Sequence, residues 1–126
     1  MFEKLELVRM AQAMAAHAGA RQGEIARNIA NADTPGFKAR DLPPFAEVYE
    51  APQWLRATRP GHLTAGPPEG AVAVARHGRG AASPNGNTVS LESEMVAAVE
   101  VQQQHEMALA IYRNTADILR ASLGRR

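Results

Sequence analysis

The 126-residue sequence predicts an elongated all-α protein, in which long N- and C-terminal helices pack as a coiled-coil-like pair joined by an irregular middle segment. Helical periodicity without proline runs from about residue 2 to 30, and a second periodic stretch begins near residue 91. Residues 51–87 contain five prolines and six glycines, which exclude a long helix there. We therefore expect one folding unit in three parts, with residues 1–50 and 88–126 flanking this loop-rich insert.

The composition favours narrow contacts between helices over a wide globular core. Hydrophobic residues make up 45% of the chain but aromatic residues only 5%, so the apolar content is largely alanine. The formal net charge of +1 supplies no broad field to attract nucleic acid. The sequence has neither a membrane-spanning apolar stretch nor the pattern of a cleavable signal peptide, so we expect no transmembrane segment and no cleaved leader.

The first helix is predicted from about Phe2 to Ala30. Gly19 and Gly23 each cost roughly 1 kcal/mol relative to alanine inside a helix, so we expect this helix to need packing partners. Its apolar residues recur at steps of three and four, as in an amphipathic helix, and they include Leu7, Ala11, Met14, Ala18, Ile25 and Ile29.

The stretch that begins at Asn28 ends this helix and turns the chain. Asn31 is expected to adopt the left-handed conformation at the helix C-terminus. Pro35 and Gly36 fit the middle of a type II turn. Asn28 and Asp33 are expected to bind backbone groups that the helix end leaves free. A simple helix stop needs fewer specified residues, so this stretch indicates a specialised interaction element.

Two weaker signals lie in the middle of the chain. After Pro44, Phe45 and Val48 fall on one face, which predicts a short helix with proline in its first turn. Val72 and Val74 alternate with alanine and predict one short strand.

The C-terminal helix shows the clearest periodicity, with apolar positions at alternating spacings of four and three, the pattern of a heptad seam. Ser90 is placed to cap its N-terminus, and Gly124 marks its end. A second apolar stripe predicts more than one helical neighbour. The predicted seam comprises Leu91, Met95, Ala98, Gln102, His105, Leu109, Tyr112, Ala116, Leu119 and Leu123, and the second stripe comprises Val101, Ala108, Ile111, Thr115 and Ile118.

The chain offers no constellation typical of catalysis or of metal binding. It has no cysteine, and its four histidines include no i, i+4 pair, so we expect no metal and no cofactor. His105 is expected to set register on the seam, and His17 to be exposed. We do not expect an enzyme, because no paired carboxylates converge in an evident pocket-forming region.

A resemblance to a known family rests on the turn stretch, which reads Asn28-Ile29-Ala30-Asn31-Ala32-Asp33-Thr34-Pro35-Gly36-Phe37. It closely resembles the N-terminal signature of bacterial flagellar rod and hook proteins. In that family the signature closes an N-terminal helix, which pairs with a C-terminal heptad helix. The short length, Lys38-Ala39-Arg40-Asp41, and Gly86-Asn87-Thr88-Val89-Ser90-Leu91-Glu92 look most like a proximal rod protein.

The resemblance implies a structural subunit that joins a higher-order helical assembly and transmits torque. It implies export by the flagellar type III apparatus without a cleaved signal, and a place in the periplasmic rod of the basal body. The implied partners are other rod proteins and the junction with the membrane ring. The residues expected to carry assembly are Asn28, Ile29, Asn31, Asp33, Thr34, Pro35, Gly36, Phe37, Leu91, Met95, Leu109, Tyr112, Leu119 and Leu123.

Three other interpretations remain at this stage. The nearest is a sister proximal rod protein of the same family. The second is a soluble coiled-coil adaptor or export chaperone, which explains the helices but not the specified turn. The third is a hydrolase of cell-wall glycan, which would need two carboxylates converging in a cleft.

Overall fold

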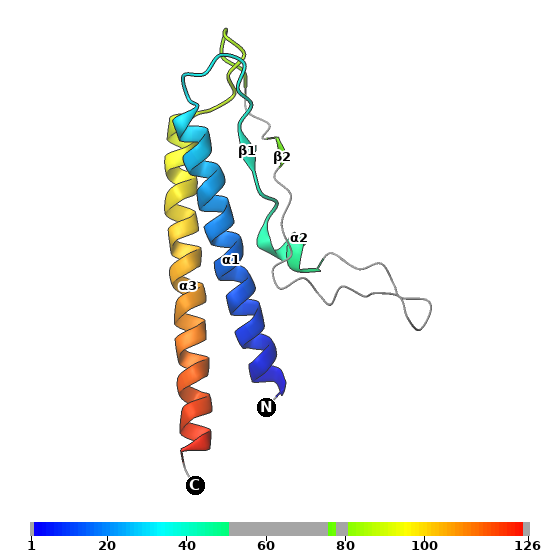
Figure 1. Ribbon diagram of the computed structural model, residues 1–126, viewed down its shortest axis with the longest axis vertical. Helices are drawn as coiled ribbons and strands as arrows, with labels where there is room; N and C mark the ends of the chain where they lie inside the picture. The colour runs from blue at the N-terminus through cyan, green and yellow to red at the C-terminus, as the bar shows by residue number, and fades with distance from the viewer. Residues whose placement is uncertain (1, 51–75, 78–80, 125–126) are drawn as a thin grey trace, which may run out of the picture.

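The computed structural model describes residues 2–50, 76–77 and 81–124. Two long helices dominate these residues: α1 spans Phe2–Ala30, and α3 spans Leu91–Leu123. The helices lie side by side and antiparallel, so the start of α1 and the end of α3 lie at the same end of the pair (Figure 1). This arrangement confirms the predicted elongated fold with two packed terminal helices.

Three short elements lie beside the helical pair, namely β1 (Arg40–Asp41), α2 (Phe45–Glu50) and β2 (Arg76–His77). β1 runs along α1 and leads into α2 (Figure 1). α2 confirms the short helix predicted after Pro44. The strands pair antiparallel, with Arg40 opposite His77 and Asp41 opposite Arg76. The strand predicted at residues 72–74 lies outside the described residues.

The contact between α1 and α3 is narrow and built from small side chains. Its central cluster joins Ala18 and Ile25 of α1 to Val101 of α3, with exposed fractions of 1%, 4% and 1%. Fully burying a valine or isoleucine contributes about 1.5–3 kcal/mol, so a core of this size supplies modest stability. Ala97 and Ala98 pack against the cluster and let the two helices approach closely.

The face of α3 that meets α1 is centred beside the predicted seam, of which only Ala98 packs against the central cluster of the described residues. Val101, Ala108 and Thr115 are buried there, with 1%, 1% and 3% of their surfaces exposed. Met95 and Leu123 of the predicted seam are 65% and 69% exposed. A series of buried and half-buried positions precedes the predicted seam positions by one residue each, and it comprises Glu94, Ala97, Val101, Gln104, Ala108, Ile111 and Thr115.

The predicted period was right, but the contact with α1 uses the predicted second stripe in place of the seam, since Val101, Ala108 and Thr115 all belong to that stripe. One residue along an α-helix is a rotation of 100°, so the large seam side chains point away from the line of contact. The small facing side chains Ala11 and Ala18 set a short distance between the helices, which suits Ala108 better than leucine or methionine. His105, expected to set register on the seam, is exposed for the same reason.

α3 begins and ends where predicted, after Ser90 and before Gly124. The Ser90 side chain accepts a hydrogen bond from the Ser93 backbone N–H at 3.4 Å, as an N-cap does. Gly124 donates its N–H to the Arg120 carbonyl at 2.7 Å. None of the described helices is both long enough and apolar enough to cross a membrane.

Candidate functional site

The end of α1 is closed by the side chain of Asn31. Its Nδ2 donates to the Arg27 carbonyl at 2.9 Å, and its backbone N–H reaches the same oxygen at 3.1 Å. The predicted left-handed backbone at Asn31 is wrong, because only Gly36 and Gly86 have positive φ among the described residues. The side-chain amide adds a second donor to this carbonyl, so Asn31 supports the helix end without a left-handed backbone.

The turn that follows has the predicted geometry. The Phe37 N–H donates to the Thr34 carbonyl at 3.2 Å. Gly36 has φ +75°, as the third position of a type II turn requires, and Pro35 occupies the second position. Thr34 Oγ1 donates to Asn31 Oδ1 at 3.2 Å, which ties the turn back to the helix end.

Asn87 is the functional residue that sequence reasoning missed. Its side chain lies under the turn, only 2% exposed, and its Nδ2 is 2.9, 2.8 and 2.8 Å from the carbonyl oxygens of Asn31, Ala32 and Thr34. Its Oδ1 accepts from the Val89 N–H at 2.7 Å. Asn87 lies in a stretch that contributes to the family resemblance, but its contact with the turn is not predictable from the local sequence.

Backbone contacts extend this attachment along both segments. The Gly36 N–H donates to the Asn85 carbonyl at 3.0 Å, and the Thr88 N–H donates to the Phe37 carbonyl at 3.0 Å. The Ala39 N–H donates to Thr88 Oγ1 at 2.7 Å. The turn after α1 and the loop before α3 are therefore joined into one structural unit.

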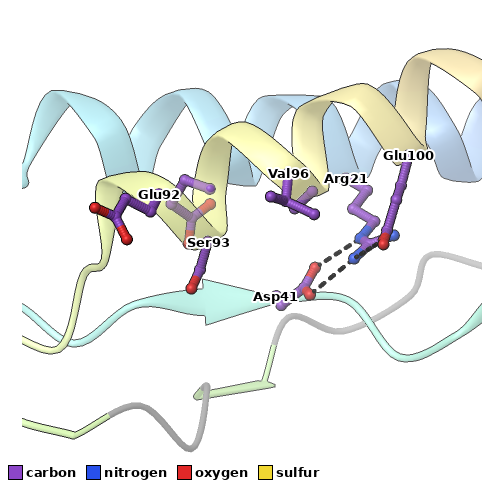
Figure 2. Close-up of a pocket in the computed structure, with 8 residues that line it drawn as sticks. Arg21, Asp41, Glu92, Ser93, Val96 and Glu100 are labelled. Carbon is purple, nitrogen blue, oxygen red and sulfur yellow. Dashed lines mark hydrogen bonds and ion pairs between the residues drawn. The ribbon is translucent and has the colours of Figure 1, made fainter.

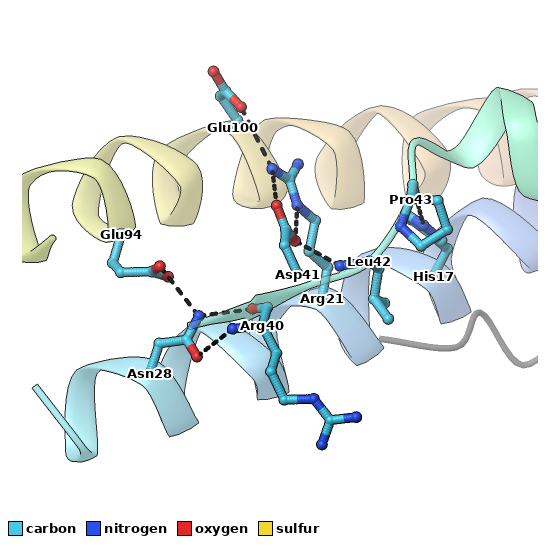
Figure 3. Close-up of polar contacts among 9 residues, drawn as sticks. All are labelled: His17, Arg21, Asn28, Arg40, Asp41, Leu42, Pro43, Glu94 and Glu100. Atoms are coloured by element: carbon cyan, nitrogen blue, oxygen red, sulfur yellow. Dashed lines mark hydrogen bonds and ion pairs between the residues drawn. The ribbon is translucent and has the colours of Figure 1, made fainter. Parts of the chain in front are cut away.

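Asn28 joins α1, β1 and α3 (Figure 3). This side chain is 1% exposed; its Nδ2 donates to the Arg40 carbonyl at 2.7 Å, and its Oδ1 accepts from the Arg40 N–H at 3.0 Å. Nδ2 also lies 3.1 Å from Glu94 Oε1. Asn28 was expected to bind backbone groups left free at the helix end, but the backbone groups that it binds belong to Arg40 of β1. Asp33 is exposed and makes no such bond to the described residues.

A second set of contacts holds β1 and the segment after it to α1. Arg21 binds Asp41 through two nitrogens and lies 3.9 Å from Glu100 of α3 (Figure 3). His17 Nε2 lies 2.8 Å from the Pro43 carbonyl oxygen, and its ring meets the Phe45 ring edge-on at 5.6 Å. His17 is 8% exposed, so the prediction that it is exposed was wrong.

An open groove of about 480 Å³ lies where β1 meets the two helices (Figure 2). Burial raises the pKa of the Glu94 carboxyl above its usual range, and the hydrogen bond from Asn28 opposes that shift. Arg21 pairs with Asp41 of β1 and lies near Glu100 of α3, so its charge helps to hold β1 beside the two helices. The groove is lined by Arg21, Asp41, Glu92, Ser93, Glu94, Val96, Ala97 and Glu100.

The structure separates the predicted assembly residues into two groups. The turn residues gather at the end of the pair where α1 finishes and α3 begins (Figure 1). The apolar residues of α3 are spread along the helix and do not meet the turn as one cluster. Most are exposed: Leu91 51%, Met95 65%, Leu109 38%, Tyr112 41% and Leu123 69%, with Ile29 of α1 at 41%.

Comparisons with known proteins point in one direction. The family model described as flagella basal body rod protein matches residues 11–38, which include the turn. The flagellar basal body rod protein FlgB of Agrobacterium fabrum is 29% identical over 118 residues, covering 89% of this chain and 88% of the relative. The flagellar basal body rod protein FlgB of Cereibacter sphaeroides is 33% identical over 93 residues, covering 72% of this chain and 73% of the relative.

Proposed function

Because this chain belongs to the family of flagellar basal body rod proteins, we propose that it is a structural subunit of the proximal rod that assembles by helix packing and transmits torque. The FlgB-like assignment is favoured over the sister protein FlgC, since the relatives described above are both FlgB. Its partners are the adjacent rod proteins and the junction with the membrane ring. It reaches the periplasmic rod through the flagellar type III export apparatus.

The apolar surface of α3 supports this proposal. Met95, Leu109 and Leu123 lie outside the contact with α1 and are exposed in the single chain. Leu109 and Tyr112, three residues apart on one helix face, are both exposed, and exposed apolar surface gathered on one face favours protein association. In a rod, neighbouring subunits would cover it, and the energy of burying these side chains would drive assembly. The observed phase of α3 makes this surface available, because small residues occupy the intramolecular contact.

The test is Leu109→Asp. Leu109 is 38% exposed in the chain, so the charge remains hydrated in the free subunit. Burial of an unpaired carboxylate in the rod would cost several kcal/mol. We expect the variant to be made and exported near wild-type levels but to be absent from purified basal bodies.

Ala110→Asp is the matched control, because it adds the same charge one residue further on, at an exposed position that points in another direction. We expect this variant to be incorporated. Wild-type incorporation of the Leu109→Asp chain would show that this surface is not an assembly interface. A stable cytoplasmic complex with a single client, in place of export, would instead support the adaptor or chaperone interpretation.

A further inference from the structure

The turn after α1 takes most of its support from residues far away in the sequence. The Ala32 carbonyl oxygen is bound by Asn87, and the Gly36 N–H is bound by the Asn85 carbonyl. The Ala39 N–H is bound by Thr88. Pro35, Gly36 and Lys38 are exposed, so little apolar burial holds this segment. The turn therefore depends on polar contacts that the N-terminal half of the chain does not supply.

We infer that the loop before α3, residues 83–89, is the template on which this turn folds, and that Asn87 is the positioning residue of that template. The turn takes its shape only when the loop docks, so the element that ends α1 is conditional on the C-terminal half of the chain. If the chain is a rod subunit, the docked turn is needed for its incorporation, and this consequence rests on the proposed function. The template itself is a property of the single chain and is tested separately.

The chemistry at position 87 calls for asparagine. The side chain has to donate toward three carbonyl oxygens and accept from one backbone N–H, and a primary amide does both. An amide NH₂ has two hydrogens, so at least one of them is shared among the three carbonyls. Aspartate has nearly the same shape and keeps the acceptor for Val89. It would place a carboxylate oxygen against the carbonyl oxygens, which is repulsive.

The backbones of the two segments also fit closely. Gly86 has φ +84°, and a Cβ atom there would lie 3.4 Å from the Gly36 Cα atom. Lys38 Nζ donates to the Gly86 carbonyl at 2.8 Å. The two positive-φ glycines thus face each other at the point of closest approach. These contacts hold the loop in register, so that the Asn87 amide lies under the turn.

Asn87→Asp in the full-length chain tests the inference through amide hydrogen exchange, residue by residue. We expect the Gly36, Ala39 and Thr88 amides to exchange at least about tenfold faster than in the unchanged chain, because local opening becomes easier. Amides near Ala18 and Val101 should keep their protection, since the packed centre of the helical pair is not altered. Loss of protection at the centre as well would mean global unfolding and would overturn a local template role.

Asn114→Asp is the matched control, because it makes the same change at an exposed position of α3, outside the turn and the loop. We expect exchange of the Gly36 amide to stay near its original rate. Thr88→Val is a second, uncharged variant that removes only the acceptor for the Ala39 N–H, and we expect faster exchange mainly at that amide.

Two results would overturn the inference. One is equal protection of the turn amides in the Asn87→Asp and Asn114→Asp chains. The other is absence of protection at the Gly36 and Ala39 amides of the unchanged chain, because the template is intramolecular. The Asn87→Asp chain could show faster exchange at the turn amides and still be present in basal bodies at the normal level. This result would agree with the template inference and contradict only the need for the template in rod assembly.

Discussion

Arg21 of α1 and Asp41 of β1 form a two-point ion pair, with Arg21 Nε 3.0 Å from Asp41 Oδ1 and Arg21 Nη2 3.3 Å from Asp41 Oδ2. Little apolar surface accompanies this contact, since Ala39 and Leu42 are the buried apolar side chains next to β1 among the described residues. Attachment of β1 to the helical pair therefore depends on directed polar bonds. Such bonds fix the position of a segment more strongly than they stabilise it.

Replacing Arg21 by lysine should lower the free energy of unfolding by about 0.5–1 kcal/mol, because lysine cannot form the two-point contact. The loss is modest because the Asp41 side chain is 46% exposed and its charge is screened by water. Urea denaturation at low salt and at about 1 M salt measures it, and the difference should shrink at high salt. Arg27→Lys, at an exposed position, should change stability little at either salt concentration.

Glu94 should make stability depend on pH in the acid range. Burial raises the pKa of this carboxyl in the folded chain, so the folded state binds its proton more tightly than the unfolded state does. Glu94 therefore lowers the free energy of unfolding at pH values above its pKa in the folded chain. This penalty diminishes as the pH falls toward the pKa of Glu94 in the unfolded chain. Glu94→Gln keeps an oxygen for Asn28 and lacks this titration.

The stability difference between Glu94→Gln and the unchanged chain, measured by urea denaturation at a series of pH values, should favour the variant most at neutral pH. The advantage should narrow as the solution becomes more acidic. An advantage of the variant that grows on acidification would contradict a raised pKa. Glu106→Gln is a control on the same helix at an exposed position, and we expect no matching trend.

Gly36→Ala should destabilise the chain by about 1–2 kcal/mol, because an L-residue is disfavoured at φ +75°. A Cβ atom at Gly36 would meet nothing within 4 Å, so the cost comes from the backbone alone. Gly23→Ala is the opposite case: its Cβ also meets nothing within 4 Å, and helix propensity should stabilise the chain by up to about 1 kcal/mol. Thermal unfolding of both variants checks the signs.

Val101→Ala and Leu109→Ala should differ in a way that identifies the face of α3 packed on α1. Val101 is 1% exposed, and its truncation should cost about 1–3 kcal/mol of unfolding free energy. Leu109→Ala removes more carbon but should change stability by less than about 0.5 kcal/mol, because that side chain is at the surface. Denaturant titration of both variants measures these two changes in unfolding free energy. A larger cost at Leu109 would mean that the predicted seam faces α1 after all.

Local features of the fold were predictable because they depend on neighbours in the chain. The absence of proline and the apolar period placed α1 and α3, and Ser90 was identified as a cap from its position before a periodic stretch with acidic residues in the first turn. Pro35 followed by Gly36 specified the turn, since one residue fixes φ and the other tolerates a positive value. These preferences act within a few residues and need no partner.

The phase of α3, the burial of His17 and the role of Asn87 depended on the tertiary structure. A stripe of leucine and methionine is a good core pattern by itself, yet the small side chains of α1 select the adjacent alanine-rich face. His17 is buried because Pro43 and Phe45 return over it, and that return is invisible in the pattern of α1. Asn87 binds carbonyl oxygens more than fifty residues earlier. Such contacts depend on which surfaces meet, and the sizes and polar groups of both surfaces decide that together.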